Sequence, residues 1–441
     1  MINKTLIIYI SGFGRILTVG VQRAKRNFAY NRQIEIEHLR PTDTKSFWKY
    51  IGKIGVGNDR LNKIPMEVVQ EDGSTTCDRN IVLNKWKNSF CDLLNKPNVT
   101  CENSMNNENI HYNNLDCEIT CDEIIKAWNN MKNGKAPGVD KLLVELLKNN
   151  AAVCILHKIC NMCFNSGIIP SLWSKGIITP IPKCSTSDHT NPLTYRGITL
   201  APSAYKVYCG VINDRLSDWV DDKGLRCEEQ NGFRKGRSTV DHLSTLTSII
   251  ETRKLKKIST FAAFIDFRKA YDKINRSILF NKLENLGLSG KMLRTLLSIY
   301  SRVQCCVKLN DFYTDWFDVN AGLKQGCKLS PLLFNLFIND LVEELKKLNI
   351  GIQIGDEKAC VLLYADNVVL LAENETEFQL LLNVLNTWCC KNDLEVNYDK
   401  SKIVHFRNQS RIVTSKDFHI GDNTIEIVTK YNYLGFLLLN F

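Results

Sequence analysis

The sequence contains no apolar run long enough to cross a membrane. Its most apolar N-terminal stretch, LIIYISGFGRILTVGV, is interrupted by Gly12, Gly14 and Arg15, whereas a membrane-spanning helix needs about 20 consecutive apolar residues. Basic residues follow this stretch instead of preceding it, which is the reverse of a secretory signal peptide. The sequence therefore predicts no membrane partner, and it shows no internal repeat that would indicate a solenoid.

Cysteine pairs at zinc-ribbon spacing are also missing. The 17 cysteines are an odd number scattered along the chain, whereas secreted disulfide scaffolds are usually short, with even counts. Cys160 and Cys163 form a Cys-x-x-Cys pair in an apolar helical stretch, which favours buried thiols over a zinc site. These features predict an intracellular, reducing location without deciding between nucleus and cytoplasm.

What is present is the composition of a globular protein with a basic surface. Hydrophobic residues make up 44% and charged residues 24% of the 441 residues, and the formal net charge is +10. The charge favours a polyanionic partner such as nucleic acid, although many basic proteins bind none. Residues 1–118 are interpreted as a basic N-terminal extension with helical patterns and an Asn-rich linker. From Ile119 the chain is expected to fold as one continuous unit.

Helical and strand patterns alternate irregularly after Ile119, which predicts an α+β fold. Helices are expected over 120–136, 141–149, 153–165, 203–220, 276–287, from Pro331 onward, and over 375–388. Strands are expected as a pair within 174–183, as a hairpin formed by 303–310 and 316–323, and over 259–267 and 402–406.

The stretch CVLLYADNVVLLAE predicts a hairpin with a polar tip. Two apolar runs flank Tyr364, Ala365, Asp366 and Asn367. Asp266 ends another apolar strand, STFAAFIDF. Carboxylates among apolar residues are costly unless they are neutralised, and Mg²⁺ binds one or two carboxylates together with substrate phosphates. If the fold brings the two aspartates together, they form a candidate two-metal site.

Further motifs follow in a fixed order, and with these carboxylates the sequence resembles the reverse transcriptases of non-LTR (LINE-type) retrotransposons. The resemblance runs from about Ile119 to the end of the chain. The matching stretches are NGKAPGVD, IITPIPK, TYRGITL, EEQNGFRKGRSTVDHL, FIDFRKAYD, GLKQGCKLSPLLFNLFINDL, YADN, LEVNYDKSKIVHF and YNYLGF. It implies a right-hand polymerase with a small antiparallel palm sheet backed by helices on one face, with fingers over 119–257 and palm over 258–441.

The resemblance implies roles for residues around the metal site. Asp266 and Asp366, with Asn367 as a third ligand, would hold two Mg²⁺ ions, for which Mn²⁺ can substitute, between a DNA primer end and a dNTP. Tyr271 would exclude ribonucleotides by a clash with the 2′-hydroxyl. Lys400 would protonate the departing pyrophosphate, or it is a solvated charge.

Other residues would contact the nucleotide and the nucleic acid. Lys183 and Arg196 would grip the triphosphate, and the Gln325–Gly326 turn would touch the nucleotide or the template. Phosphates of the RNA template would be contacted by Arg234, Lys235 and Arg237. The YNYLGF stretch would form the primer grip, which implicates Tyr433 and Gly435.

The sequence departs from the family pattern at several places, and two of them bear on activity. The family's Tyr-Ala-Asp-Asp box has Asn367 at its fourth position, so one ligand charge is lost and weak or absent polymerisation is expected. After YNYLGF the chain ends at Phe441, so a fragment without a thumb, with low processivity, is expected. The oligomeric state is left open.

Two other functions compete with reverse transcription. A catalytically inactive relic would bind RNA–DNA hybrid without magnesium-dependent extension. An RNA-dependent RNA polymerase is suggested by the Asp-Asn pair, but Tyr271 argues against it, because an enzyme that uses ribonucleotides needs room for the 2′-hydroxyl.

Overall fold

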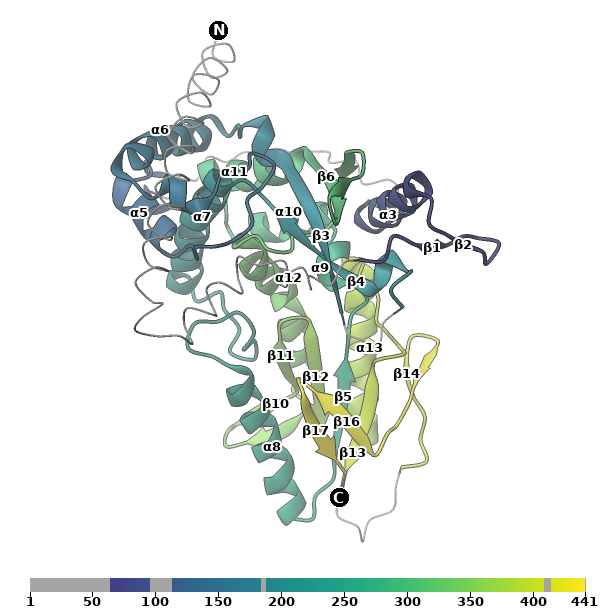
Figure 1. The fold of residues 1–441 in the computed structure, drawn as a ribbon. Helices are drawn as coiled ribbons and strands as arrows, with labels where there is room; N and C mark the ends of the chain where they lie inside the picture. The colour runs from purple at the N-terminus through teal and green to yellow at the C-terminus, as the bar shows by residue number, and fades with distance from the viewer. Residues whose placement is uncertain (1–63, 96–112, 184–187, 408–413, 441) are drawn as a thin grey trace, which may run out of the picture. The chain divides into compact units, whose positions relative to one another are not determined.

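The computed structural model describes residues 64–95, 113–183, 188–407 and 414–440. The chain divides into two units, Met1–Pro65 and Met66–Phe441, and the following description concerns the second unit (Figure 1). The first 63 residues of the expected N-terminal extension (1–118) lie outside the described ranges, as does most of its Asn-rich linker. No helix in the described ranges has the length and apolar character needed to cross a membrane.

The α-helices are α3 (Arg79–Leu94), α4 (Asn113–Asp116), α5 (Cys121–Asn129), α6 (Asn150–Ser166), α7 (Ser203–Asp222), α8 (Thr239–Leu255), α9 (Ala270–Lys273), α10 (Arg276–Asn285), α11 (Gly290–Ser301), α12 (Leu329–Lys346) and α13 (Glu375–Asn392). Short 3₁₀ helices span η2 (Val144–Leu147), η3 (Ser171–Ser174) and η4 (Pro192–Thr194). Local sequence explains several helix starts: Thr120 and Ser238 form capping boxes before α5 and α8.

The strands are β1 (Val68–Val69), β2 (Thr75–Thr76), β3 (Lys175–Pro182), β4 (Tyr195–Leu200), β5 (Thr260–Ile265), β6 (Val303–Leu309), β7 (Phe312–Tyr313), β8 (Phe317–Val319), β9 (Ile352–Ile354), β10 (Glu357–Ala359), β11 (Val361–Tyr364), β12 (Asn367–Ala372), β13 (Lys402–Phe406), β14 (Phe418–Ile420), β15 (Asn423–Ile425), β16 (Lys430–Tyr433) and β17 (Phe436–Leu439). Helices and mainly antiparallel sheets coexist, which confirms the α+β prediction.

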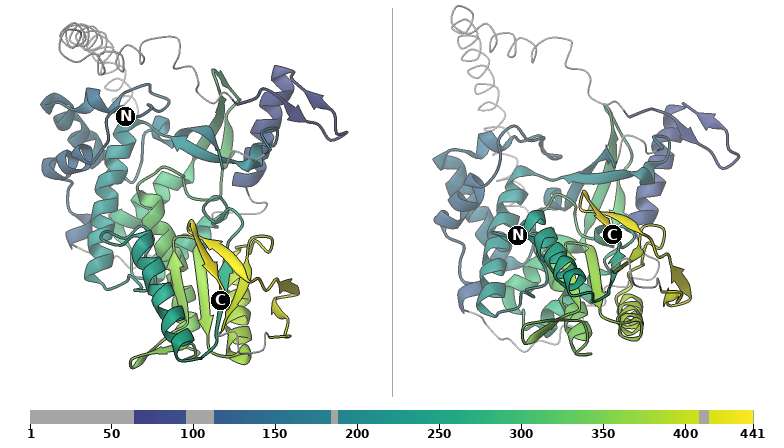
Figure 2. Two further views of the ribbon diagram at one scale, coloured as in Figure 1. Left: turned by 60° about the horizontal axis from the view of Figure 1, so that its bottom comes forward. Right: turned by 90° about the horizontal axis from the view of Figure 1, so that it is seen from below.

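A four-stranded antiparallel sheet with the order β11-β12-β5-β13 lies at the centre. One face packs on α12 and α13, and the other packs on α8 and on the hairpin β16–β17 (Figures 1 and 2). Every residue of β5 is therefore buried. Helices on one face alone were expected. The apolar sequence of β5 after Thr260 reflects burial on both faces, since a sheet with one solvated face alternates apolar and polar residues.

A five-stranded mixed sheet has the order β4-β3-β6-β7, with β8 also paired to β6. Strand β3 is antiparallel to β4 but parallel to β6. The expected strand pair within 174–183 is wrong, because these residues form one strand. Its two partners lie elsewhere in the chain, one of them after the expected boundary at 257/258, so no local pattern indicated them. The hairpin formed by β6 and β8 is confirmed.

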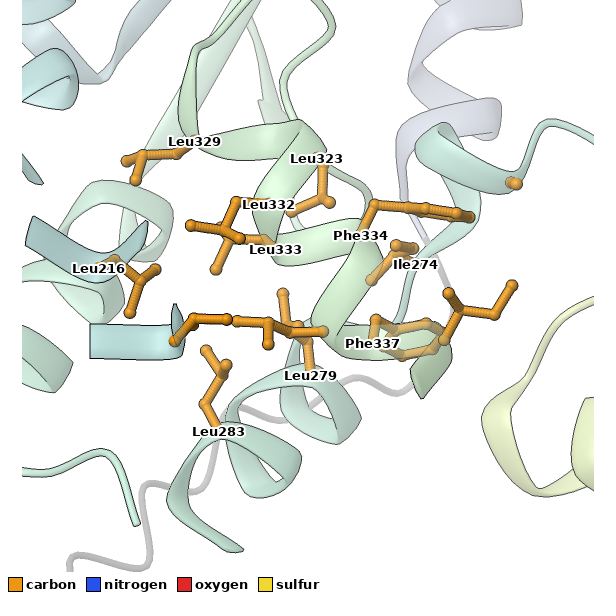
Figure 3. Packing of buried hydrophobic residues seen from close by; sticks show 14 of the residues in the cluster. Leu216, Ile274, Leu279, Leu283, Leu323, Leu329, Leu332, Leu333, Phe334 and Phe337 are labelled. Carbon is orange, nitrogen blue, oxygen red and sulfur yellow. The ribbon is translucent and has the colours of Figure 1, made fainter. Parts of the chain in front are cut away.

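Helix α12 is the main internal support of the fold. Pro331 lies in its first turn, where the missing N–H costs no helical hydrogen bond. Its apolar side chains pack on α10 and α7, as Figure 3 shows for Leu333, Leu279 and Leu216. The helix expected over 141–149 is wrong except for the single turn η2, because Asn149 caps the separate helix α6. Cys160 and Cys163 are buried in α6, as expected for core thiols.

Candidate active site

The hairpin β11–β12 presents Asp366 at a two-residue turn. Tyr364 pairs with Asn367 across the strands, so Ala365 and Asp366 form the turn. Ala365 adopts a left-handed conformation with φ 56°, which is uncommon for a residue other than glycine. The hairpin predicted from the sequence is confirmed, and its tip carries the carboxylate as expected.

Asp266 lies beside this turn because β5 is the neighbour of β12. Val368 pairs with Ile265, so one step further along the two strands Asn367 comes opposite Asp266. Burial raises the pKa of the Asp366 carboxyl, and the negative charge of Asp266 raises it further. The fold therefore brings together the two carboxylates that the sequence places far apart.

The loop that precedes β13 holds Asp266 in place. The Asn397 side-chain amide donates to Asp266 Oδ2 over 3.0 Å, and the Asp266 backbone N–H donates to Ser401 Oγ over 3.1 Å. The Lys400 ammonium lies 3.9 Å from Asp266 Oδ2, with its side chain largely exposed. Lys400 therefore offsets part of the negative charge of the carboxylate pair.

The donor set fits a hard divalent cation with few protein ligands. Among the described residues, no three His, Cys, Asp or Glu side chains gather as a metal-binding group. Asn367 donates through its amide nitrogen to the Tyr364 carbonyl over 3.4 Å, which leaves its amide oxygen as a neutral ligand. Two carboxylates suffice for Mg²⁺ when substrate phosphates complete its coordination. The raised pKa of Asp366 indicates a buried charge that a cation would stabilise.

Basic residues of the five-stranded sheet face the carboxylates. Burial lowers the pKa of Lys183, and the nearby positive charges of Lys400 and Arg196 lower it further. The Lys183 ammonium donates to the Leu193 carbonyl over 3.1 Å. The charges of Arg196 and Lys400 in turn oppose the rise of the Asp366 pKa. Positive and negative groups from the two sheets therefore share one electrostatic environment.

Tyr271 lies between this environment and the apolar core. Its ring stacks on Phe334 with centroids 4.5 Å apart, and Phe233 meets it edge-on at 6.2 Å. Its hydroxyl is buried, and it has no hydrogen-bond partner within the described ranges. Burial raises the pKa of this hydroxyl, and the charge of Asp366 contributes. The ring is thus rigidly held beside the carboxylates.

The Gln325–Gly326 turn contacts both Asp272, which follows β5, and Thr199 of β4. Gln325 donates from its side chain to Asp272 Oδ1 over 2.9 Å, while its backbone carbonyl accepts from Thr199 of β4 over 2.9 Å. Gly326 has φ 102°, a conformation that favours glycine. Burial raises the pKa of Asp272 to about 6 and lowers that of Lys269 to about 8. The sequence interpretation did not single out Asp272 or Lys269, although both lie in the quoted FIDFRKAYD motif.

The residues expected to contact nucleic acid differ in accessibility. Arg234 and Arg237 both pair with Glu228, at 2.9 Å and 2.6 Å. Lys235 is exposed, and no ion pair is recorded for it among the described residues. The two arginines would have to leave Glu228, or share it, to bind phosphate.

The expected primer grip is a real hairpin, but its tyrosine is buried. Tyr433 is the last residue of β16, its side chain is buried, and its hydroxyl hydrogen-bonds to His242 Nε2 over 2.9 Å. Gly435 forms the exposed turn with Leu434, both at positive φ, and a side chain at position 435 would meet nothing within 4 Å. Accessible contact at this hairpin therefore falls to the turn and to exposed strand residues such as Phe436 and Leu437, and not to Tyr433.

A buried set of polar side chains around His242 links the β16–β17 hairpin to residues 230–231, and the sequence did not predict it. His242 contacts Asn231 over 3.1 Å as well as Tyr433, and burial lowers the pKa of His242 to about 4. Gln230 hydrogen-bonds to the Ala365 backbone. Gln230, Asn231 and His242 belong to the quoted EEQNGFRKGRSTVDHL motif. The sequence interpretation considered only the arginines and the lysine of this motif, as surface contacts to phosphate.

The sequence of the chain is similar to those of known polymerases. The family model described as reverse transcriptase (RNA-dependent DNA polymerase) matches residues 181–438. A probable RNA-directed DNA polymerase from transposon BS of Drosophila melanogaster is 29% identical over 73% of this chain and 36% of its own length. A Pol polyprotein of a type-1 retrotransposable element R2 from Popillia japonica is 26% identical over 72% of this chain and 44% of its own length.

Among solved structures, apo telomerase from Candida tropicalis superimposes with a TM-score of 0.42 and 14% identity, over 66% of this chain and 51% of that chain. The chain thus spans less than half the length of both curated relatives named above. The family model covers more than half of the chain, and the relatives' names confirm the resemblance to non-LTR retrotransposon polymerases. The chain belongs to the reverse transcriptase (RNA-dependent DNA polymerase) family.

Proposed function

We propose that this chain performs RNA-templated DNA synthesis, in which a primer 3′-hydroxyl attacks the α-phosphorus of a dNTP and pyrophosphate departs. The observation that carries the proposal is the meeting of Asp266 and Asp366 at the ends of adjacent strands, opposite Lys183 and Arg196. Among the described residues, Lys400 offsets only part of the carboxylate charge. A nucleotide triphosphate with its divalent cations has the charges that would complement both the carboxylates and the basic residues.

The cation ligands are Asp266, Asp366 and the amide oxygen of Asn367. Two Mg²⁺ ions bound there would supply charge stabilisation for the attacking and leaving oxygens. Asn397 and Ser401 fix the orientation of Asp266, so the carboxylate does not need to reorganise when substrate binds.

The remaining residues bind and select the nucleotide. Lys183 and Arg196 contact the triphosphate, since ammonium and guanidinium groups pair well with phosphate oxygens. Tyr271 is held by Phe334 and would clash with a 2′-hydroxyl, which selects deoxyribonucleotides. The Gln325–Gly326 turn supports the nucleotide or template. The Lys400 ammonium lies 3.9 Å from Asp266 Oδ2, where it is the candidate donor to pyrophosphate.

The RNA template and DNA primer would lie along the basic surface beside these sheets. Arg234, Lys235 and Arg237 are the candidates for template phosphate contact, and the turn at Gly435 is the candidate for primer contact. In this proposal, residues 119–257 are the fingers and 258–441 the palm.

Asn367 is expected to limit the rate. An amide in place of a carboxylate removes one negative charge from the cation site, and losing one such oriented group costs on the order of 10²–10³ in rate. The same observation supports the second candidate function, a non-catalytic protein that binds RNA–DNA hybrid. Single-nucleotide incorporation distinguishes the two functions.

The test is incorporation of one dNTP on a primed RNA template, with Mg²⁺ and then with Mn²⁺. We expect slow incorporation that Asp266→Ala abolishes. Hybrid binding without incorporation in the parent and in Asn367→Asp would instead establish the binding function. Equal use of ribonucleotides and deoxyribonucleotides would support an RNA-dependent RNA polymerase.

A further inference from the structure

The backbone of residues 229–233 runs along the free edge of strand β11. The Leu363 N–H donates to the Glu229 carbonyl over 2.9 Å, and the Asn231 N–H donates to the Leu363 carbonyl over 2.8 Å. Gln230 sits opposite Leu363 in this short parallel pairing. Because Leu363 lies two residues before Ala365, the side chain of Gln230 reaches the turn that carries Asp366.

The Gln230 carboxamide binds the backbone of that turn on both sides. Its oxygen accepts from the Ala365 N–H over 2.9 Å and from the Gly232 N–H over 2.8 Å, and its nitrogen donates to the Ala365 carbonyl over 3.2 Å. The side chain is 2% exposed. A left-handed alanine is disfavoured by itself, so the turn needs such outside support.

The backbone of this segment packs so closely against the turn that no side chain fits at position 232. A Cβ at Gly232 would lie 2.1 Å from the Ala365 nitrogen. From the other side, Asn335 of α12 donates to the Gly232 carbonyl over 3.0 Å. The next residue, Phe233, has φ 60° and meets Tyr271 edge-on. One segment therefore contacts both the carboxylate turn and the candidate sugar gate.

We propose that Gln230 is a positioning residue, which holds the Ala365–Asp366 turn in the conformation that directs Asp366 toward the cation and substrate. The proposal rests on the proposed function for its kinetic consequences, but its structural part does not depend on turnover. Gln230 itself would touch neither substrate nor metal, and it acts through the backbone of Ala365.

The chain offers a matched control in Asn161. Its carboxamide also binds the N–H and the carbonyl of one distant residue, Ile119, over 2.7 Å and 2.8 Å. Asn161 lies on α6, which packs on α5 and α11, and none of these helices carries a candidate site residue. Gln230→Met and Asn161→Leu each remove the same kind of support with little change of volume.

The first measurement is hydrogen exchange of peptides that cover residues 361–372. In Gln230→Met, exchange at the turn should accelerate by about tenfold or more, since a buried hydrogen bond is lost, while β5 stays protected. Asn161→Leu should leave the turn unchanged. Unchanged exchange at the turn in Gln230→Met would overturn the proposal, whether or not the parent is active.

The second measurement is single-turnover dNTP incorporation in the Asn367→Asp background. Gln230→Met should lower the maximal rate by about 30-fold or more, while the KM for dNTP stays within about threefold. The reason is that the Asp366 carboxylate loses its orientation, whereas no contact to the substrate is removed. Asn161→Leu should change neither value. Equal losses in the two variants would reduce Gln230 to a structural role and contradict the proposal.

A third variant covers the case in which Gln230→Met does not fold. Gln230→Glu keeps the acceptor for both backbone N–H groups, but it replaces the donor to the Ala365 carbonyl with a carboxylate oxygen. It should retain most of the protection at the turn and show an intermediate rate. If hydrogen-exchange protection and rate equal those of the parent, the donor is dispensable. That result would contradict the proposal that Gln230 acts through both the N–H and the carbonyl of Ala365. Absence of incorporation in every protein, the Asn367→Asp parent included, would refute the proposed function, while exchange would still decide the role of Gln230.

Discussion

The two large sheets of the molecule contribute opposite charges to one place. The four-stranded sheet is antiparallel and buried on both faces, and the ends of its strands carry Asp266 and Asp366. The five-stranded sheet is mixed, and it carries Arg196 on β4 and Lys183 at the end of β3. Within each set burial and like charges disfavour the ionised form: the pKa of Asp366 is raised and that of Lys183 is lowered.

This difference teaches that neither sheet is a site by itself. Each gathers charges of one sign at a cost in free energy, and the opposite set relieves only part of that cost. A ligand that carries cations toward the aspartates and phosphates toward the basic groups would relieve both. Perturbed pKa values of this kind are typical of functional sites.

The largest effect on the incorporation rate is expected when an aspartate of the four-stranded sheet is removed. Asp266→Ala should lower single-nucleotide incorporation by about 10³-fold or more, because a cation ligand supplies several kcal/mol of transition-state stabilisation. Rapid-quench incorporation measures it. Asp399→Ala, which removes an exposed carboxylate in the neighbouring loop, is the control, and an equal loss there would contradict the assignment.

The missing charge on the same side can be restored. Asn367→Asp should raise the incorporation rate by on the order of 10²–10³, since it completes the carboxylate set of the cation site. The measurement is the rate with Mg²⁺ at saturating dNTP. Equal and robust activity of parent and variant would refute the proposed impairment.

Removing a basic residue of the five-stranded sheet should weaken the binding of dNTP. Lys183→Met removes one charged contact to the triphosphate, which is worth about 10- to 100-fold in KM for dNTP with a smaller change in maximal rate. Steady-state kinetics at one nucleotide position measures both values. A fall in maximal rate at unchanged KM would contradict a binding role.

How far the sequence predicted this arrangement differs between the two sheets. The strands of the four-stranded sheet are short apolar runs bounded by turn residues, and β5, β11, β12 and β13 were all expected. Strand β3 was misread as a pair, since its partners β4 and β6 lie outside the stretch, β6 more than a hundred residues away, and its two prolines resemble turn residues. Local periodicity cannot report a parallel pairing with a strand more than a hundred residues away.

The site was predictable where residues end strands or form turns. Asp266 and Asp366 drew attention because a carboxylate after an apolar run has no packing role, and the resemblance to the reverse transcriptase motifs supplied their expected role. Gln230 could not, because a neutral polar residue within a basic stretch has the pattern of a surface loop, and only its burial shows what it binds. Tyr433 was expected to contact nucleic acid, but its burial depends on α8 and on the hairpin that it helps to form.

A smaller effect is expected at the junction of the two sheets. Tyr271→Val should reduce the preference for dNTP over rNTP by about tenfold or more, because space opens for the 2′-hydroxyl. Tyr271→Phe is the control, since the hydroxyl has no hydrogen-bond partner in the described structure and its loss should leave the preference unchanged. Unaltered discrimination in Tyr271→Val would exclude the gate.

The smallest effect is on stability and tests the buried network behind the turn. The pKa of His242 is about 4 in the folded chain against an ordinary value of 6.5, so the unfolded chain binds a proton first as the pH falls. The contribution of His242 is full above pH 6.5 and is lost toward pH 4, with a magnitude of about 1–3 kcal/mol. Urea unfolding at pH 7 and pH 5 should show a smaller loss for His242→Gln than for the parent. An equal loss would contradict a buried neutral imidazole.

The measurement that tests the meeting of the two sheets most directly is a double-mutant cycle for Mn²⁺–dNTP binding, followed by the EPR signal of free Mn²⁺. The proteins are the parent, Asp366→Ala, Arg196→Ala and the double variant. If the two side chains hold opposite ends of one ligand, the coupling free energy should be about 1 kcal/mol or more. Losses that add without coupling, or no dependence on Arg196, would show that the two sheets do not form one site.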